Sequence, residues 1–579
     1  MSLRISRESL PVLLLGVVFV LASILMPKTW HIEAVIPVGS VSSPEKNLII
    51  ARICCLLDGI WCLLIALTAW RWKRLSAASL IEPKHIEGNE IVSRKTASLI
   101  LIAASVLGLI LRLISLDSSF WLDEITPLTF YRDTSVFGLL TTYFSTNNHL
   151  LYTLLEKVAV TMFGEQEWAV RLPSVLFGVA TVPIMYILTR TIAPRWISLS
   201  TALLTAVNYQ LIFFSQNARG YTGHLFFTLA ATLFLVRGLK KDKFVHWCLY
   251  CACMFFNLAS IIASLSALIA HFVIGTVAAI VVQKRSGGGW ALFRRIGCVT
   301  FLALLMVLHL YSIIFPQAYA VVQDTYHVQS TGFTLFSTEF LNELIRGFKF
   351  SNNPLILAAA IPGIAVVVAG VCALYRCSWV MLAALGLPEI FLALYLLKLG
   401  LSVSPRFFLL ALPFALIVGA LGLYDLVKRV LLKINQPKLL TPTFSLGILC
   451  VALVSVPTLL QYYKIPKQDF RGAVLYLREK PEKIYPLSLY TAREGFGYYA
   501  NKNGMRLDND YFDGRTLEKI DNVLKQHRLD QFYVVTTFPR ALHLDHPELE
   551  ALVEKHWVVD RVFPGSIGDG DITVWKPRK

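Results

Sequence analysis

The stretch ASLILIAASVLGLILRLISLDSSFWLDEITPL, residues 97–128, runs from a long apolar segment directly into two adjacent acids, Asp123 and Glu124. An apolar run of about 17–25 residues is long enough to cross a bilayer as a helix. Ionisable side chains beside a membrane are costly and tend to mark function. This stretch therefore predicts a spanning helix that leads into a polar site.

The composition extends this interpretation to the whole chain. Of the 579 residues, 56% are hydrophobic and 16% are charged, whereas soluble proteins have about 45–50% and 25%. The sequence predicts an all-α polytopic membrane protein with about thirteen transmembrane helices. The runs of spanning length lie at 9–26, 48–70, 97–116, 171–190, 197–214, 220–237, 245–261, 263–282, 296–315, 353–374, 379–398, 405–427 and 444–462.

The positions of Lys and Arg predict the orientation of the chain. If the N-terminus is inside, the basic loops, such as RWKR at 71–74 and RGLKK at 237–241, all fall on one side. The positive-inside rule makes that side cytoplasmic. The loop 117–170 and everything after about 463 are then extracytoplasmic. The net charge of +17 is mostly a topology signal, so we expect no nucleic-acid partner.

One apolar piece inside that loop, LLYTLLEKVAVTMFG at 150–164, could be counted as a further span. Counting it would place the later basic loops outside. The piece has 15 residues, which is short for a span, and it contains Glu156 and Lys157. We therefore expect an amphipathic helix that lies at the membrane interface.

The chain divides into three predicted parts. Residues 1–96 hold two additional spans and a linker, 97–462 form the transmembrane core, and 463–579 form a small extracytoplasmic α/β domain. In the last part we expect a helix over 472–478 and strands in KIYPLSLY, QFYVVTTF and DITVW. All ten cysteines fall in spans or at cytoplasmic ends, so neither a disulfide framework nor a cysteine-based zinc site is expected in the outward loops.

Polar residues that the spans do not explain gather on one side of the predicted membrane. Asp123 and Glu124 begin the long loop, Asn148 and His149 lie further along it, and SQNARGY at 215–221 and SPRFF at 404–408 follow or precede spans on the same side. Their convergence on one face is the main sequence evidence for a site.

These segments resemble the GT-C polytopic glycosyltransferases, in particular the protein O-mannosyltransferases, the lipid A aminoarabinose transferases and the rhizobial lipopolysaccharide galacturonosyltransferases. The resemblance covers about 97–500 and departs from the family pattern at Leu150, Leu151 and Phe407, and in the two additional N-terminal spans. Its motifs are LDE at 122–124, NNHLLYTLLEKVAVTMFGEQEWAVRLPSVLFGVATVPIMYILTR at 147–190, SQNARGY at 215–221, PRFFLLALP at 405–413 and QDFRGAVLYLRE at 468–479.

The resemblance implies an integral-membrane glycosyltransferase, a hexosyl- or pentosyltransferase that moves one sugar from a polyprenyl-phosphate donor to a lipid, glycan or protein acceptor. Inversion at the anomeric carbon is part of this expectation. So is a place in the plasma (inner) membrane, in lipopolysaccharide or other glycan biosynthesis of the cell envelope. No cofactor follows from the resemblance, although a divalent cation is left open.

The chemistry of such a transfer gives each residue type a task. A carboxylate can take the proton of an acceptor hydroxyl, and fixed cations or donors stabilise the departing phosphate. The pair Asp123 and Glu124 supplies the base, and the resemblance implies Asp123, with Glu124 orienting it or binding the acceptor. The predicted substrate-binding residues are Asn148, His149, Arg219, Tyr221 and Arg406, and of these Arg219, Arg406 and His149 are the candidates to bind the phosphate.

Other interpretations stay open at this point. The acids could cap a helix, Arg219 and Arg406 could anchor to lipid headgroups, and Arg171 is expected to be a structural anchor at the interface. A lipid or solute transporter also has many spans, but it needs ionisable groups along a path at mid-membrane. An oligosaccharide transferase is disfavoured because a Trp-Trp-Asp-Tyr-Gly motif is absent from the sequence.

Overall fold

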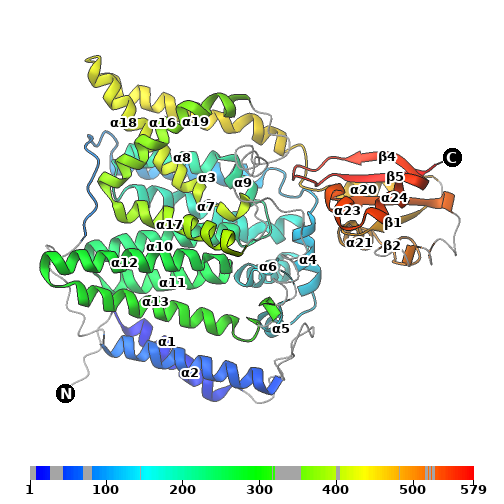
Figure 1. Ribbon diagram of the computed structural model, residues 1–579, viewed down its shortest axis with the longest axis horizontal. Helices are drawn as coiled ribbons and strands as arrows, with labels where there is room; N and C mark the ends of the chain where they lie inside the picture. The colour runs from blue at the N-terminus through cyan, green and yellow to red at the C-terminus, as the bar shows by residue number, and fades with distance from the viewer. Residues whose placement is uncertain are drawn as a thin grey trace.

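The protein is a bundle of long helices with a small α/β domain at one end (Figure 1). The computed structural model describes residues 8–26, 44–68, 81–143, 145, 147–315, 317–319, 354–399, 405–481, 483–514, 519–520, 523 and 529–578. The N-terminus lies on the bundle and the C-terminus on the α/β domain.

Each of the thirteen predicted spans overlaps a helix of the bundle. By length and hydropathy, eight helices of the described residues can cross a membrane, or nine if α8 and α9, which meet at 55°, form one span. The exact count of thirteen therefore stays a prediction. The helices of the bundle, whether or not they pass this test, are α1 (Leu10–Leu25), α2 (Pro44–Thr68), α3 (Arg94–Leu113), α7 (Glu167–Thr189), α8 (Arg195–Val207), α9 (Tyr209–Ser215), α10 (Tyr221–Lys241), α11 (Phe244–Ser260), α12 (Leu265–Ser286), α13 (Gly289–Tyr311), α16 (Pro354–Cys377), α17 (Trp379–Leu399), α18 (Ala411–Lys433) and α19 (Leu440–Tyr462).

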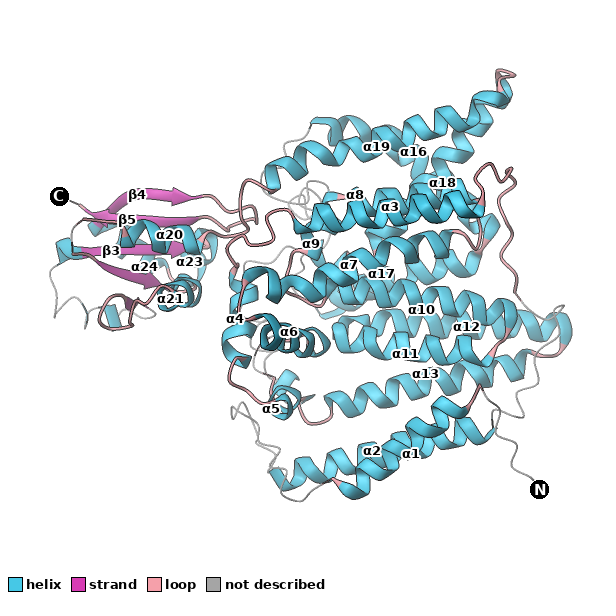
Figure 2. Ribbon diagram, turned by 180° about the vertical axis from the view of Figure 1, so that it is seen from behind, coloured by secondary structure: helices cyan, strands magenta, loops and turns pink. Residues whose placement is uncertain are grey.

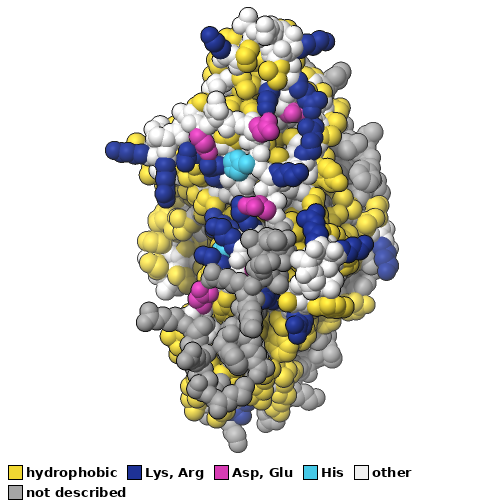
Figure 3. All heavy atoms as spheres, turned by 90° about the vertical axis from the view of Figure 1, so that its left-hand side faces the viewer, with side chains coloured by type: hydrophobic (Ala, Val, Ile, Leu, Met, Phe, Trp, Pro, Cys, Tyr) yellow, Lys and Arg dark blue, Asp and Glu magenta, His cyan; other side chains and the backbone are white. Residues whose placement is uncertain are grey.

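The end of the bundle far from the α/β domain carries many basic side chains. Figure 3 views this end and shows Lys and Arg gathered there around a few acids. The linker before α3 runs across this end of the bundle. The amides of Ile81, Lys84 and Ile86 donate hydrogen bonds to carbonyls near the ends of α10, α16 and α7, respectively. The additional hairpin α1–α2 lies beside α13, where Asp58 is 2.8 Å from His309.

The opposite end is covered by short helices that follow α3. These are α4 (Leu122–Tyr131), α5 (Val136–Thr141) and α6 (Leu150–Phe163), and Figures 1 and 2 show them between the bundle and the α/β domain. The piece 150–164 is thus helical, as predicted. Its Glu156 is buried at 3% exposure rather than part of a solvated polar face.

The C-terminal domain is built on a five-stranded sheet with the order β2-β1-β3-β5-β4. The three predicted strands are confirmed as β1 (Tyr485–Leu489), β3 (Phe532–Thr537) and β5 (Ile572–Pro577), and the predicted helix as α20 (Phe470–Arg478). Two strands were not predicted, β2 (Phe512–Gly514) and β4 (Trp557–Phe563). Both are edge strands; β2 is three residues long and β4 has a register shift against β5. The remaining helices are α21 (Ala492–Lys502), α23 (Pro539–Asp545) and α24 (Pro547–His556).

The domain shares a hydrophobic core with the segment that carries the two acids. Phe120, Ile125 and Leu128 of that segment cluster with Phe470 and Phe496 of the domain, and all five are buried. Burial of such side chains contributes about 1.5–3 kcal/mol each. The acidic segment is therefore packed against the domain as well as against the bundle.

Candidate active site

Glu124 is held in a buried ion pair with Arg171. The Arg171 Nε and Nη2 atoms donate to the two Glu124 carboxylate oxygens at 2.9 and 2.6 Å, and the side chains are 1% and 0% exposed. The same guanidinium also donates to the carbonyls of Leu116, Ser118 and Ser119. Arg171 is a structural anchor, as predicted, and its partner is the acidic segment.

The remaining acceptor positions of Glu124 are also used. Its carboxylate accepts from the backbone amides of Ala218 at 2.8 Å and Trp121 at 3.3 Å. Burial alone would raise the pKa of Glu124, but Arg171 and Lys467 outweigh it and hold that pKa below the usual range. A carboxylate with four donors and no exposure has no free oxygen for a substrate.

Asp123 has a different environment. Its Oδ2 lies 2.9 Å from Arg219 Nη1 and 3.0 Å from Arg406 Nη1, and Oδ1 accepts from Asn147 at 3.3 Å. Burial would raise the pKa of Asp123, but the two guanidinium groups outweigh it and hold that pKa below its ordinary value. Its side chain is 19% exposed, so this ionised carboxylate is reachable.

The two arginines come from parts of the chain far apart in sequence. Arg219 precedes α10 and is 4% exposed, whereas Arg406 lies in a short 3-10 turn before α18 and is 35% exposed. Among the described residues, two cations face one anion here. The Arg219 Nε atom is buried without a hydrogen-bond partner among the described residues, which is costly unless a ligand or water completes it.

The segment SQNARGY docks directly against the acidic segment. Gln216 donates to the carbonyls of Arg112 and Ile114, and Asn217 accepts from the Trp121 indole at 3.1 Å. Together with the Ala218 amide and the Arg219 guanidinium, four successive residues contact the 112–124 region. The convergence that the sequence predicted is therefore a physical contact.

Gly220 permits a close approach at the start of α10. A Cβ atom there would lie 2.3 Å from the Ser260 carbonyl oxygen and 3.1 Å from the Cβ of His149. This oxygen also pairs with His149 Nδ1 at 3.2 Å. Because a carbonyl can only accept, Nδ1 carries the proton. Burial and the nearby Arg219 hold the pKa of His149 well below its usual value.

His149 is consequently neutral at physiological pH, and its Nε2 is a hydrogen-bond acceptor. That atom is buried and has no partner among the described residues. A neutral acceptor does not suit an ionised phosphate, so the structure disfavours His149 as the phosphate ligand that the sequence suggested. It suits a hydroxyl instead.

The other two predicted binding residues lie nearby with different surroundings. The Tyr221 ring is 5.7 Å from the His149 ring and 5.5 Å from the Arg219 guanidinium carbon. Asn148 is buried and donates to the Thr142 carbonyl at 3.3 Å, so its amide supports the loop. Asn147, which was not in the predicted binding set, contacts Asp123 instead.

A divalent cation, which the sequence left open, does not fit this arrangement. Asp123 Oδ2 is held by two guanidinium groups and Oδ1 by the Asn147 amide, and Glu124 is fully engaged by Arg171 and two backbone amides. A hard cation needs several free oxygen ligands. Within the residues that the structure describes, no group of three or more His, Cys, Asp or Glu side chains could hold a metal ion.

Several positioning residues were not identified from the sequence. Gln468 accepts from the Leu122 amide at 2.8 Å, and the Tyr499 hydroxyl accepts from the Phe120 amide at 2.7 Å. The buried Lys467 donates to the Gln216 carbonyl. Only the motif QDFRGAVLYLRE pointed to this region, and it gave no contact partner.

Residues 149–315 match the family described as dolichyl-phosphate-mannose-protein mannosyltransferase. Among solved structures, apo ArnT from Cupriavidus metallidurans is 12% identical with a TM-score of 0.51, covering 83% of this chain and 98% of that chain. The same protein bound to undecaprenyl phosphate is 13% identical with a TM-score of 0.49, covering 84% of this chain and 98% of that chain. The Archaeoglobus fulgidus oligosaccharyltransferase is 12% identical with a TM-score of 0.45, covering 84% of this chain and 74% of that chain. A search of curated proteins finds no match.

The family match and the likeness to apo ArnT agree with the resemblance seen in the sequence. The matched segment contains His149, Arg219 and Tyr221. The ArnT likeness extends over almost the whole of that chain and shows a shared fold. The chain is therefore a multi-pass membrane protein whose fold is similar to that of ArnT and whose residues 149–315 match a mannosyltransferase family model.

Proposed function

We propose that the protein transfers a single sugar from a polyprenyl-phosphate donor to a hydroxyl acceptor outside the cytoplasm. The observation that carries this proposal is the Asp123 carboxylate between Arg219 and Arg406. Guanidinium groups suit phosphate as well as carboxylate, so the two arginines can bind the donor phosphate. The description of the matching family, which names a dolichyl-phosphate sugar, supports this choice of donor.

The donor phosphate competes with Asp123 for the two arginines. As the guanidinium groups turn to the phosphate, Asp123 loses the cations that lower its pKa, and it becomes a stronger base. The acceptor hydroxyl then gives its proton to Asp123 while its oxygen attacks the anomeric carbon. The bond from that carbon to the phosphate oxygen breaks, and the lipid phosphate leaves with the electron pair, stabilised by Arg219 and Arg406.

The environment of Glu124 supports inversion at the anomeric carbon. A retaining transfer by double displacement needs a carboxylate nucleophile as well as an acid and base. Glu124 cannot supply it, because its oxygens are engaged by Arg171 and two amides. We assign Glu124 a positioning role, in which it fixes the first turn of α4 and with it Asp123.

His149 and Tyr221 complete the proposed donor site. The free Nε2 of His149 can accept a hydrogen bond from a sugar hydroxyl, and the Tyr221 ring beside it offers an apolar face. The aromatic ring also lies against the Arg219 guanidinium, which supports the orientation of that cation. These contacts do not specify the sugar, which we leave as a hexose or pentose.

The proposed location is the plasma (inner) membrane, with the site and the C-terminal domain on the extracytoplasmic face. The basic end of the bundle opposite the site supports this orientation (Figure 3), because cytoplasmic loops are rich in Lys and Arg. The division at 96 and 462 into an additional hairpin, a catalytic core and an extracytoplasmic domain is part of the same proposal.

The test compares donor binding with turnover in one preparation of Asp123→Asn. Loss of a general base costs on the order of 10²–10⁴ in rate, so release of lipid phosphate should fall by that factor. Donor lipid should bind at least as tightly, because the substitution removes a competing anion from the arginines. Asp133→Asn, at an exposed acid of the same loop, is the control. Parent-like turnover by Asp123→Asn would refute the proposal.

A further inference from the structure

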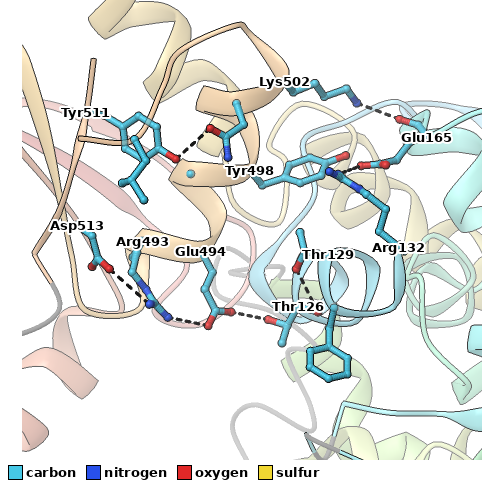
Figure 4. A pocket seen from close by; sticks show the side chains of 14 residues that line it. Thr126, Thr129, Arg132, Glu165, Arg493, Glu494, Tyr498, Lys502, Tyr511 and Asp513 are labelled. Atoms are coloured by element: carbon cyan, nitrogen blue, oxygen red, sulfur yellow. Dashed lines mark hydrogen bonds and ion pairs between the residues drawn. The ribbon is translucent and has the colours of Figure 1, made fainter. Parts of the chain in front are cut away.

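A cleft of about 780 Å³ separates α4 from the C-terminal domain. Figure 4 shows Thr126 and Thr129 of α4 on one side and Arg493 and Glu494 of α21 on the other. Its volume lies within the range of about 300–1,000 Å³ that is usual for pockets of small-molecule ligands. None of the residues assigned above to the donor site lines it.

The cleft begins close to the proposed catalytic base. Thr126 follows Asp123 by three residues on α4, and residues at that spacing lie on the same helix face. The rise of about 1.5 Å per residue places them about 4.5 Å apart along the helix axis. Thr126, which lines the cleft, is therefore a near neighbour of Asp123 on α4.

Among the described residues that line the cleft, the charges are balanced. The three cations are Arg132, Arg493 and Lys502, and the three anions are Glu165, Glu494 and Asp513. Arg132 lies 2.5 Å from Glu165, and Arg493 lies 3.1 Å from Glu494 and 3.6 Å from Asp513. Lys502 lies 3.4 Å from Glu167 behind the cleft. The described lining of this cleft therefore offers no unpaired charge to a phosphate or an acidic ligand.

The uncharged lining suits carbohydrate. The Tyr498 and Tyr511 rings and Phe130 supply aromatic faces, while Asn501 and the two threonines supply neutral donors and acceptors. Tyr511 donates to Asn501 at 3.1 Å. Paired carboxylate and guanidinium groups can accept from and donate to neighbouring sugar hydroxyls at the same time, so a neutral polyhydroxylated chain matches this surface.

The walls are held in place before any ligand arrives. Thr126 donates to Glu494 at 2.9 Å across the cleft. Behind it, Glu167 accepts from Tyr499 at 3.0 Å and is also paired with Arg471 and Lys502. A preorganised site loses less free energy to ordering on binding. The cleft is thus a built site rather than a gap between loosely joined domains.

We infer that this cleft binds the acceptor, and that the bound part of the acceptor is a neutral glycan whose hydroxyl reaches Asp123. The inference rests on the proposed function, because it assigns the second substrate of that reaction. The hydroxyl loses its proton to Asp123, its oxygen forms the new bond to the anomeric carbon, and the lipid phosphate departs. A lipid headgroup rich in phosphate and an acidic peptide are the competing occupants.

The experiment measures glycan binding by the full chain in detergent, without donor. The probes are neutral oligosaccharides of two to four hexose units, their sulfated counterparts, and vesicles of anionic phospholipid, each at low and high salt. We expect neutral glycans to bind with little salt dependence, because no net charge is involved. Thr129→Trp fills the cleft and should raise the glycan Kd by about tenfold or more while donor binding stays unchanged.

Thr161→Trp is the matched control. Among the described contacts, each of these threonines donates only within its own helix. Thr129 donates to the carbonyls of Ile125 and Thr126, and Thr161 donates to the carbonyl of Lys157. Thr161, however, does not line the cleft. Failure of every neutral glycan to bind, tighter binding of sulfated glycans or anionic vesicles, or equal glycan affinity in both Trp variants would overturn the inference. Since donor turnover is assayed separately, any of these results leaves the proposed function standing. Conversely, glycan binding by a protein that shows no donor turnover would refute the proposed function and not the assignment of the cleft to a glycan.

Discussion

The buried pair between Glu124 and Arg171 gives the most quantitative prediction. Arg171→Met removes a guanidinium that is 1% exposed and leaves a carboxylate at 0% exposure without its main partner. Breaking a buried pair in this way costs about 3–5 kcal/mol, which is on the order of a hundred- to several-thousand-fold in a folding equilibrium. The same substitution also frees the carbonyls of Leu116, Ser118 and Ser119.

The control is Arg429→Met on α18. Arg429 lies 2.8 Å from Asp425 but is 59% exposed, and exposed pairs contribute about 0–1 kcal/mol. The double variant Glu124→Gln with Arg171→Met should recover much of the lost stability, because it leaves no uncompensated buried charge. Its turnover should stay low, since α4 loses the contacts that fix Asp123.

The free energy of unfolding is measured by titration with denaturing detergent in mixed micelles, and donor turnover is measured in the same preparations. A cost for Arg171→Met no larger than that for Arg429→Met would show that the pair is not the anchor of the acidic segment. A double variant as unstable as Arg171→Met would show that something other than the unpaired carboxylate causes the loss.

Four further outcomes are expected. Arg219→Lys should reduce turnover although it keeps the charge, because the planar guanidinium that can hold carboxylate and phosphate together is lost. Gly220→Ala should lower turnover and thermal stability, since its Cβ would lie 2.3 Å from a carbonyl oxygen. Burial lowers the pKa of Lys467 to about 7 in the folded protein, whereas the pKa of an unfolded lysine is about 10.4. Between these two pH values the folded state binds fewer protons than the unfolded state, so the melting temperature should rise with pH from 7 towards 10. This rise should be larger in the parent than in Lys467→Met. Cysteines placed at Trp290 and Leu544, which are 68% and 46% exposed, should label from opposite sides of the membrane; labelling from one side would refute the orientation.

The architecture was predictable because a bilayer imposes a strong constraint on sequence. Long apolar runs must be helices when no water can satisfy the backbone, and all thirteen predicted runs overlap helices of the bundle. The edge strands β2 and β4 lacked such a constraint. β2 has three residues, and β4 pairs with one neighbour through a shifted register, so neither gives a long periodic pattern.

The roles of the two adjacent acids could not be separated from the sequence. Asp123 and Glu124 have the same chemistry and neighbouring positions, and their difference arises only from what surrounds each of them. Glu124 meets Arg171, which is 47 positions away, whereas Asp123 meets Arg406, which is 283 positions away. Tertiary contacts of this kind engage both oxygens of Glu124 and leave Asp123 partly exposed, which is why we propose different roles for the two acids.

The contacts of the C-terminal domain explain why the family resemblance reaches into it. The motif QDFRGAVLYLRE begins at Gln468, which holds the Leu122 amide, and Arg471 donates to the Asp117 carbonyl at 2.7 Å. The domain therefore supplies hydrogen-bond partners to the segment that carries Asp123, and one wall of the proposed acceptor cleft. Because the same contacts fix the base and the acceptor wall, a change in how the domain docks alters both together. We expect acceptor specificity in relatives of this protein to vary through residues of the cleft wall, such as Asn501, and not through the residues that dock the domain.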